Sequence, residues 1–332
     1  MATFAETAPR TPVTESIRVD KVSPASRLWH NVRAVLVVVF ALVGLIPVVF
    51  MVQTAFKTRA DVVSVPPKVL FEPTMEGFIF LLTERSQVAA GRQQALLEEP
   101  QELSWAEELM LQRGQEILGP SQYVTRLRNS IIIAGVSTIA SVILGLFAAY
   151  AFSRFDVAGK DDLLFFILST RMLPPVVVTI PLFLMYSTLG LHDTHFGMIL
   201  LYTVFNLSFS VWLLKGFIDE IPREYEEAAL VDGYSRLQAF FRIVLPQALT
   251  GIAATTVFCL IFAWNEYAFA LMLTSDRART APPSIATMLG RGGIEWAAIA
   301  AGTLGFLIPV VIVTFALRDY LLRGVTFGAI RQ

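Results

Sequence analysis

The chain has 332 residues, of which 55% are hydrophobic and only 16% are charged. A soluble domain usually carries about 25% charged residues, and the mean hydropathy of +0.62 points the same way. A formal net charge of −1 excludes the strongly basic surface of a nucleic-acid-binding protein. The single cysteine, Cys259, excludes a disulfide framework and a cysteine-based zinc site. The composition therefore indicates an integral membrane protein.

Six apolar runs are long enough to cross a bilayer, for which about 20 helical residues suffice. The third run contains Arg171 and three prolines that remove backbone donors, so we expect it to kink or break. The fifth run is interrupted only by Glu266. We therefore predict an all-α integral membrane protein with six transmembrane helices. The runs cover residues 34–56, 130–153, 163–190, 196–214, 248–275 and 297–317.

The distribution of Lys and Arg predicts that both termini are cytoplasmic, because positive charge favours that side of the membrane. In this orientation the four inside segments hold 5, 2, 4 and 3 Lys or Arg, and the two short outside loops hold 0 and 3. The long outside segment holds eight more, but long loops report topology poorly. The predicted divisions are a tail (1–33), a first transmembrane helix (34–56), an external segment (57–125), a core of five transmembrane helices (126–318) and a second tail (319–332).

The external segment is unusually long, and its part from 84 to 119 is dense in Glu, Gln, Arg and Leu. Leu103, Ala106, Met110 and Ile117 fall roughly on one helical face. We expect a helical insertion of one or two amphipathic helices lying over the bundle. It is either a cap without a specific ligand or part of a docking surface for an external partner.

Residues 219–247 form an inside loop that the sequence predicts to be a pair of short helices. Carboxylates after Pro222 suit the positive end of a first helix. Gly233 suits the left-handed conformation that ends it. Ser235 and Gln238 have the spacing of a capping box that opens the second helix.

This loop resembles the EAA loop of ABC importer permeases, whose spacing is EAA-x3-G-x9-I-x-L-P. All seven fixed positions match within 20 residues: Glu227, Ala228, Ala229, Gly233, Ile243, Leu245 and Pro246. The resemblance implies coupling helices that sit in a groove on an ATP-binding subunit. The small alanines permit close backbone approach, and Glu227 supplies a carboxylate for a basic or amide group. No GxxxxGK[ST] occurs in the chain, so the resemblance implies that this chain binds no cofactor and that a partner ATPase uses ATP-Mg.

The resemblance extends over residues 126–332 and is most specific for the carbohydrate-importer branch, in particular the smaller, maltose-type permease. It rests on Arg171 to Pro175, Pro181-Leu182, Gly190-Leu191 and Trp264 to Tyr267. The ending, with Gly324, Thr326 and Gly328, is similar to a tail that reaches between the two ATPase subunits. The segment 84–119 departs from the pattern as an insertion.

The resemblance implies a multi-pass protein of the bacterial inner membrane that imports a sugar, an oligosaccharide or a polyol. It implies three kinds of partner besides membrane lipid: a second homologous permease, two copies of an ABC ATPase subunit and an external solute-binding protein. Two alternatives remain open, a permease for a phosphate ester or peptide and an ATP-independent secondary transporter. The second would need an ionisable relay across several spans, whereas the spans offer only Arg171 and Glu266.

The candidate solute pathway comprises polar, aromatic and proline residues of the third and fifth runs. Placing Glu266 in a span costs about 2.5–3.5 kcal/mol on insertion scales, so it is expected to face the interior. It either meets a polyhydroxylated solute or serves as a structural hydrogen-bond hub. Arg171 either pairs with a carboxylate inside the bundle or packs at its periphery. The pathway residues are Arg171, Pro174, Pro175, Trp264, Asn265, Glu266 and Tyr267.

His192, Asp193 and His195 lie together in a short outer loop. Loop polarity explains them more simply than a metal site, so no metal is expected. Cys259 is interpreted as a small packing residue rather than a reactive thiol.

Overall fold

The computed structural model describes residues 24–98, 103–290 and 293–329, and the chain divides into two units, Met1–Phe50 and Met51–Gln332. The described part of the first unit belongs to one helix, α1 (Pro24–Ala55). The side chains of residues 31–50 of this helix are exposed and mostly apolar, as suits a helix surrounded by lipid. The helix begins ten residues before the predicted boundary at 34, and residues 1–23 of the predicted tail lie outside the described residues.

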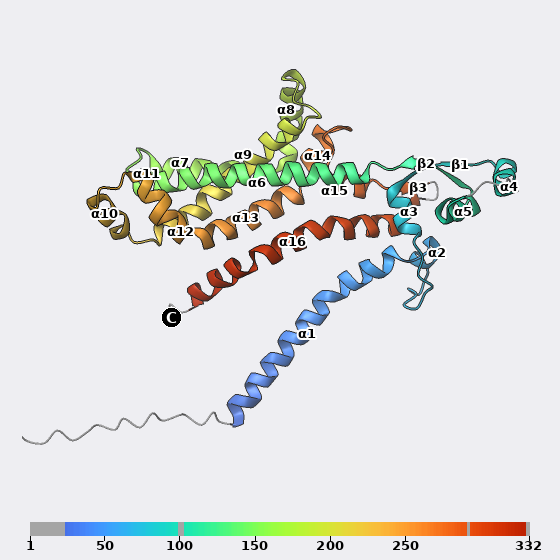
Figure 1. Cartoon of the computed structure of the whole chain (residues 1–332), viewed down its shortest axis with the longest axis horizontal. Coiled ribbons are helices and arrows are strands. Elements are labelled where there is room, and N and C mark those ends of the chain that lie inside the picture. Colours follow the sequence, from blue (N-terminus) through green and yellow to red (C-terminus); the bar gives the residue numbers. More distant parts are fainter. Residues whose placement is uncertain (1–23, 99–102, 291–292, 330–332) are drawn as a thin grey trace, which may run out of the picture. The chain divides into compact units, whose positions relative to one another are not determined.

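The core of the second unit is a bundle of four helices that run side by side (Figure 1). Helices α6 (Tyr123–Arg154) and α9 (His195–Asp219) make the most extensive contact, and α13 (Leu249–Trp264) packs against both of them and against α16 (Trp296–Ala329).

Small residues bring α6 close to α9. Ser137, Ser141 and Gly145 follow one another at intervals of four and are buried. A Cβ atom at Gly145 would lie 2.5 Å from the Cβ of Ser210 on α9, so only glycine fits there. Such stripes of small residues are how membrane helices approach closely.

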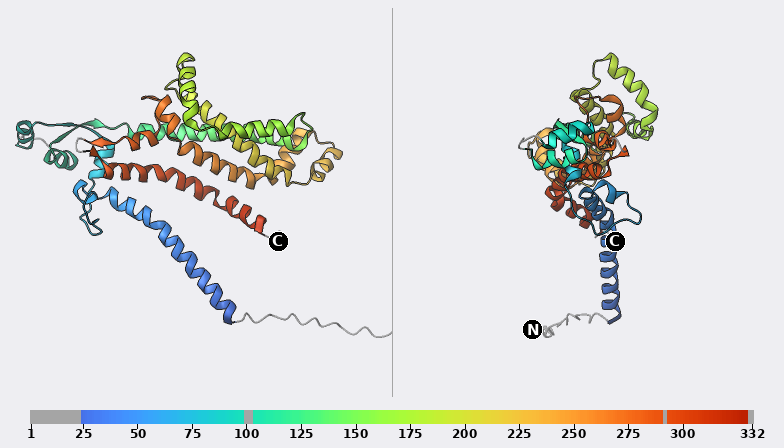
Figure 2. Two further views of the ribbon diagram at one scale, coloured as in Figure 1. Left: turned by 180° about the vertical axis from the view of Figure 1, so that it is seen from behind. Right: turned by 90° about the vertical axis from the view of Figure 1, so that its right-hand side faces the viewer.

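The third predicted span is broken, as its prolines indicated. Helix α7 (Lys160–Ser169) continues into the short η1 (Thr170–Met172), and α8 (Pro175–Thr188) leaves at an angle of 92°. Pro174 restricts the preceding Leu173 to extended backbone, with φ −68° and ψ 125°, which ends the first half of the span. Both views in Figure 2 show α8 standing away from the bundle.

The fifth predicted span is also divided, which the sequence did not indicate. It comprises α13 and α14 (Ala268–Leu273), with a break at residues 265–267. Within the described residues, four helices are long and apolar enough to span a membrane. Counting each of two strongly bent pairs, residues 160–188 and residues 236–264, as one span gives up to six. The predicted all-α membrane class is therefore confirmed, with a count of spans that reaches the predicted six.

The external segment contains strands that the sequence did not predict. Strands β1 (Thr83–Gln87) and β2 (Gln115–Pro120) pair antiparallel and carry α4 (Ala90–Glu98) and α5 (Trp105–Gln112) at their tip. The helical prediction holds for α4 and α5, but Ile117 pairs with Arg85 across the ribbon because Gly114, with φ +71°, turns the chain back. The helices therefore lie at the end of a projecting arm and not over the bundle (Figure 1).

Short elements complete the end of the bundle next to this arm: α2 (Arg59–Val62), α3 (Glu76–Leu82), α15 (Ala281–Ala286), β3 (Leu289–Gly290) and β4 (Gly293–Ile294). The apolar part of α16 that could span a membrane ends at Asp319, close to the predicted boundary at 318, and the helix itself continues to Ala329.

Candidate functional site

The predicted helix pair forms in residues 219–247. It consists of α10 (Glu224–Val231), α11 (Arg236–Ala239), a π-helical turn η2 (Phe240–Val244) and α12 (Leu245–Gln247). Gly233 has φ +88°, its N–H donates to the Leu230 carbonyl (3.1 Å), and the next N–H donates to the Ala229 carbonyl (3.0 Å). These bonds make the left-handed helix end that the sequence predicted. Ser235 and Gln238 form the predicted capping box.

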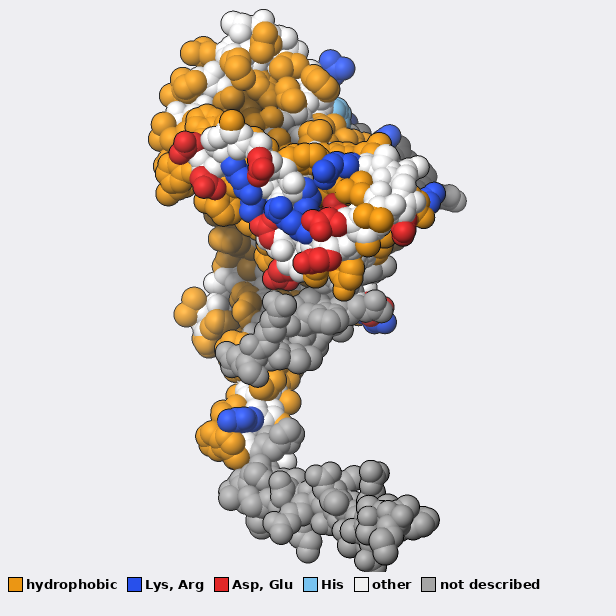
Figure 3. All heavy atoms as spheres, turned by 90° about the vertical axis from the view of Figure 1, so that its left-hand side faces the viewer, with side chains coloured by type: hydrophobic (Ala, Val, Ile, Leu, Met, Phe, Trp, Pro, Cys, Tyr) orange, Lys and Arg blue, Asp and Glu red, His pale blue; other side chains and the backbone are white. Residues whose placement is uncertain are grey.

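The two faces of α10 differ in burial. Glu227 and Ala228 are exposed, whereas Ala229 is buried against the rest of the hairpin. The alanine pair is therefore divided, with one small residue available to a partner and one packed inside. Val231 and Leu237 are 87% and 61% exposed beside this acidic face. Figure 3 views this end of the second unit, where acidic, basic and hydrophobic side chains meet.

The carboxylate next to the motif, Glu226, is the residue that anchors α10. It is 6% exposed and pairs with Arg154 at the end of α6. The Tyr150 hydroxyl donates to its second oxygen (2.9 Å). In the sequence, Glu226 is one of the carboxylates after Pro222 that indicate the start of a helix. Its spacing of three from Ala229, which puts both on one helical face, is the signal that could have identified it as an inward residue.

The hairpin joins the bundle through a bend. The Leu245 N–H donates to the Phe240 carbonyl five residues back, as in a π-helix, and Pro246 follows without an N–H. The axis then turns by 73° into α13. Of the motif residues here, Ile243 and Leu245 are half-buried and Pro246 is exposed. Single π-helical turns are frequent at functional sites.

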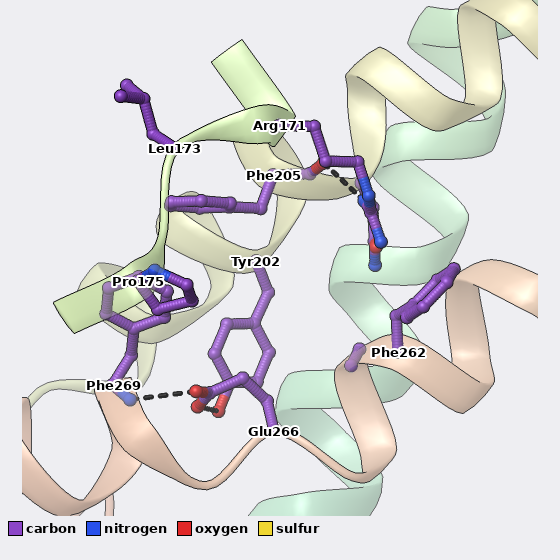
Figure 4. Close-up of a pocket in the computed structure, with 10 residues that line it drawn as sticks. Arg171, Leu173, Pro175, Tyr202, Phe205, Phe262, Glu266 and Phe269 are labelled. Atoms are coloured by element: carbon purple, nitrogen blue, oxygen red, sulfur yellow. Dashed lines mark hydrogen bonds between the residues drawn. The ribbon is translucent and has the colours of Figure 1, made fainter. Parts of the chain in front are cut away.

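A second feature is a cavity of ≈ 270 Å³ beside the break in the third span (Figure 4). Aromatic rings form much of its wall, and a guanidinium, a carboxylate and an amide supply its polar groups. The lining residues are Arg171, Leu173, Pro175, Tyr202, Phe205, Asn206, Phe262, Ala263, Glu266 and Phe269.

Glu266 lines this cavity and is also a hydrogen-bond hub. Its two oxygens accept the backbone N–H groups of Phe269 (2.8 Å) and Ala270 (3.0 Å), which open α14. The Tyr202 hydroxyl donates to the same carboxylate (2.7 Å). A carboxylate at this place satisfies free N–H groups of the helix end, so the structural role is present.

Arg171 contacts aromatic rings and one carbonyl. Its Nη1 donates to the Phe205 carbonyl (2.9 Å), and its guanidinium lies 4.2 Å from the centre of the Phe262 ring. No carboxylate of the described residues pairs with it, so the first of the two alternatives, an ion pair inside the bundle, is not found there.

The other predicted pathway residues do not line the cavity. Trp264 is buried and stacks on Phe306 at 4.6 Å, and the Asn265 side chain is exposed and donates to the Ile261 carbonyl (2.8 Å). Tyr267 and Pro174 are exposed. Thus Arg171, Pro175 and Glu266 come together as predicted. Tyr202, Phe205, Asn206 and Phe262 were missed, because runs of apolar and aromatic residues in spans do not reveal which face is inward.

The outer loop holds its carboxylate by backbone groups. Asp193 accepts the N–H groups of residues 275–278 at 3.0–3.3 Å. Partial burial acts to raise the pKa of Asp193, but these four backbone donors outweigh it and lower the pKa below 3.8. His195 bonds with Asn129 (2.8 Å), and His192 packs on Phe183. Within the described ranges no group of His, Cys, Asp and Glu could hold a metal ion.

The family model for the binding-protein-dependent transport system inner membrane component matches residues 141–327. The match includes the hairpin and the cavity. The chain belongs to this family.

Similar proteins agree with this assignment. A probable ABC transporter permease protein of Sinorhizobium fredii is 31% identical over 88% of this chain and 92% of its own length. The trehalose transport system permease protein SugB of Mycobacterium tuberculosis is 36% identical over 63% of this chain and 77% of its own length. The trehalose/maltose transport system permease protein MalG of Thermococcus litoralis is 35% identical over 62% of this chain and 74% of its own length.

The fold is likewise similar to that of a bacterial ABC transporter involved in the import of the acidic polysaccharide alginate. The TM-score is 0.62 at 23% identity, covering 90% of this chain and 98% of the other. The protein is thus a multi-pass membrane component of a transport system. Gly324, Thr326 and Gly328 belong to α16, and only the backbone of this part of the helix is described.

Proposed function

We propose that the protein is a permease subunit of an ATP-driven importer for a sugar, an oligosaccharide or a polyol. In this proposal it pairs with a second permease, two ATPase subunits that use ATP-Mg, and an external solute-binding protein. The hairpin of residues 219–247 and both termini are cytoplasmic. Support for the solute class comes from the relatives, which include permeases for trehalose and maltose and one for sulfoquinovosyl glycerol.

The observation that carries the proposal is the exposed face of the hairpin. Glu227, Ala228, Val231 and Leu237 are exposed while the residues behind them are packed. An apolar centre with a charged neighbour is the composition expected of a protein-binding surface. The contact of the chain end near Gly324, Thr326 and Gly328 with the ATPases is part of the same proposal.

The cavity suits a polyhydroxylated solute. The rings of Phe205, Phe262 and Phe269 offer apolar surfaces for the C–H faces of a sugar, and Arg171 and Asn206 offer donors for hydroxyl groups. The break of the third span places a backbone interruption beside the cavity, as in carriers whose solute sites form at broken helices. Movement of the hairpin with an ATPase would then open and close the cavity by rigid-body rotation of the helices.

A secondary transporter is less well supported. Proton coupling needs titratable groups that change partners, whereas the Glu266 carboxylate already accepts three hydrogen bonds. A phosphate ester would pair with Arg171, and it is therefore included among the solutes tested.

The test is co-purification followed by hydrolysis. The tagged chain, expressed with its neighbouring subunits, should co-purify with an ATPase and hydrolyse MgATP. Glu227→Lys should lose this ATPase, whereas Glu220→Lys, on an exposed residue before the hairpin helices, should keep it. Labelled trehalose, maltose and glycerol phosphate are then tested for binding to the external solute-binding protein and for stimulation of ATP hydrolysis by the complex. The compound that does both is the solute. A Glu227→Lys complex with unchanged composition and uptake would refute the coupling role.

Orientation has a separate test in a Cys259→Ala background. An impermeant maleimide added to intact cells should label Trp105→Cys on the arm and spare Val231→Cys on the hairpin. The reverse pattern would invert the proposed topology.

A further inference from the structure

The Arg154–Glu226 pair is the most enclosed ion pair of the described residues, with side chains 5% and 7% exposed. It joins two elements that the chain itself connects only through a long path, because 72 positions separate the residues. Arg154 ends α6, the helix with the largest packing interface in the bundle, and Glu226 lies in α10, the first helix of the hairpin.

Every polar group of the pair is engaged. Arg154 donates through Nε to Glu226, through Nη1 to the Ser153 hydroxyl (2.9 Å) and through Nη2 to the Ile221 carbonyl (2.9 Å). Tyr150 occupies the other oxygen of Glu226. A charge with this many partners is held in one place, since any displacement leaves a buried group unsatisfied.

The surrounding contacts tie the same two elements together. Arg223, directly before α10, donates to the Ser153 carbonyl at the end of α6 (2.7 Å). The Phe240 ring of η2 lies 4.6 Å from the Tyr150 ring. Among the described residues, the far side of α10, which carries Glu227, has no such connection to the bundle. One face of α10 is therefore fixed to α6, and the other is available to a partner.

We infer that the Arg154–Glu226 pair is the mechanical link by which a displacement of the hairpin is passed to α6 and hence to the transmembrane bundle. This inference rests on the proposed function, because it requires an ATPase that moves the hairpin. Both are positioning residues: neither touches the solute or ATP, and their role is to make α10 and α6 move as one body. Glu227 docks the partner, while Glu226 transmits its movement.

The experiment measures whether α10 and α6 keep their distance during the ATPase cycle. Spin labels are placed at Tyr225→Cys on α10 and Ile139→Cys on α6, both exposed, in the Cys259→Ala chain within the complete transporter. Their distance distribution is recorded without nucleotide and after trapping with MgATP and vanadate. With the link intact, the distribution should be narrow and the same in both states.

Glu226→Gln should at least double the width of the distribution and shift it on trapping, while the ATPase still co-purifies and hydrolyses ATP. Glu224→Gln is the matched control, since it lies exposed on the same helix without an ion pair among the described residues, and it should behave like the unsubstituted chain. The exchange Arg154→Glu with Glu226→Arg should restore the narrow distribution, which a purely structural loss would not do.

If Glu226→Gln prevents assembly, Tyr150→Phe, which removes one hydrogen bond and keeps the ring, takes its place and should also broaden the distribution. A narrow, unshifted distance distribution in Glu226→Gln would overturn the inference. If Glu226→Gln does not assemble, the same result in Tyr150→Phe would overturn it. Failure of the proposed function is distinct: the unsubstituted chain would then bring no ATPase with it.

Discussion

Arg171 and Glu266 line the same cavity, but the guanidinium and the carboxylate do not pair with each other. Glu266 directs its charge to the first N–H groups of α14 and to Tyr202, whereas Arg171 keeps donors that no described group accepts. The two charges therefore have different functions. Glu266 holds the break of the fifth span together, and Arg171 is the group with donors to spare for a solute.

Replacing Arg171 with Met should weaken the interaction with the solute but leave the assembly of the complex intact. A hydrogen bond to a charged group contributes about 1.5–3 kcal/mol, so solute-stimulated ATP hydrolysis should fall about tenfold or more. Basal hydrolysis should stay unchanged, because Met preserves much of the contact with Phe262. Arg128→Met, on an exposed residue of α6, is the control. Equal loss of basal and stimulated hydrolysis would assign Arg171 to packing alone.

Replacing Glu266 with Ala should act on stability. Loss of a helix-capping side chain costs about 0.5–2 kcal/mol, and the Tyr202 hydroxyl would lose its acceptor as well. Thermal unfolding of the purified complex should therefore begin at lower temperature. Glu266→Gln retains one acceptor oxygen, so the temperature at which it begins to unfold should lie between those of the unsubstituted protein and Glu266→Ala. Asn265→Ala, which removes only a bond to its own helix, should be close to neutral. If Glu266→Ala unfolds like Asn265→Ala, the capping role is wrong.

The sequence predicted what depends on local chemistry. Gly233, the Ser235–Gln238 box and the prolines at 174 and 175 each act over a few residues, and the structure has the turn, the cap and the break where they were expected. The lengths of the spans follow in the same way from bilayer thickness.

What the sequence did not show depends on contacts between distant segments. Glu226 and Glu227 are adjacent and chemically identical, and only the position of Arg154 makes one an anchor. Likewise, β1 and β2 form because residues on either side of α4 and α5 pair, which no single stretch signals. The break at 265–267 needs Tyr202 of another helix to support Glu266.

The contact of α6 with α9 predicts that Gly145→Val is destabilising. The added side chain would collide with Ser210, and overpacking a close interface costs about 1–3 kcal/mol. The measurement is the thermal unfolding temperature of the complex together with its yield in the membrane. Gly135→Val on the same helix is the control, because no atom lies within 4 Å of a Cβ there. Equal effects of the two substitutions would show that the interface tolerates the added volume.

The outer loop should lose order in acid, but only at low pH. Asp193 accepts the backbone N–H groups of residues 275–278, and this lowers its pKa below the ordinary value of 3.8. A carboxyl group whose pKa is lowered on folding stabilises the folded state above its unfolded pKa. That contribution is lost as the pH falls through the lowered value.

Hydrogen exchange of the amides of residues 275–278, corrected for the intrinsic pH dependence of the rate, measures this directly. In the unsubstituted protein, protection should be constant from about pH 7 to about pH 4 and should decline only below that range, because the carboxylate stays ionised until its lowered pKa is reached. Asp193→Asn tolerates the left-handed backbone, with φ 54°, but replaces one acceptor with a donor. Its protection should therefore be reduced already at neutral pH, with no further decline in acid.

Asp276→Asn is the control: it removes the neighbouring exposed carboxylate and should show the same pH dependence of protection as the unsubstituted protein. A decline of protection between about pH 6 and pH 5 would mean that the pKa of Asp193 is raised, since protonation would then precede the unfolded value.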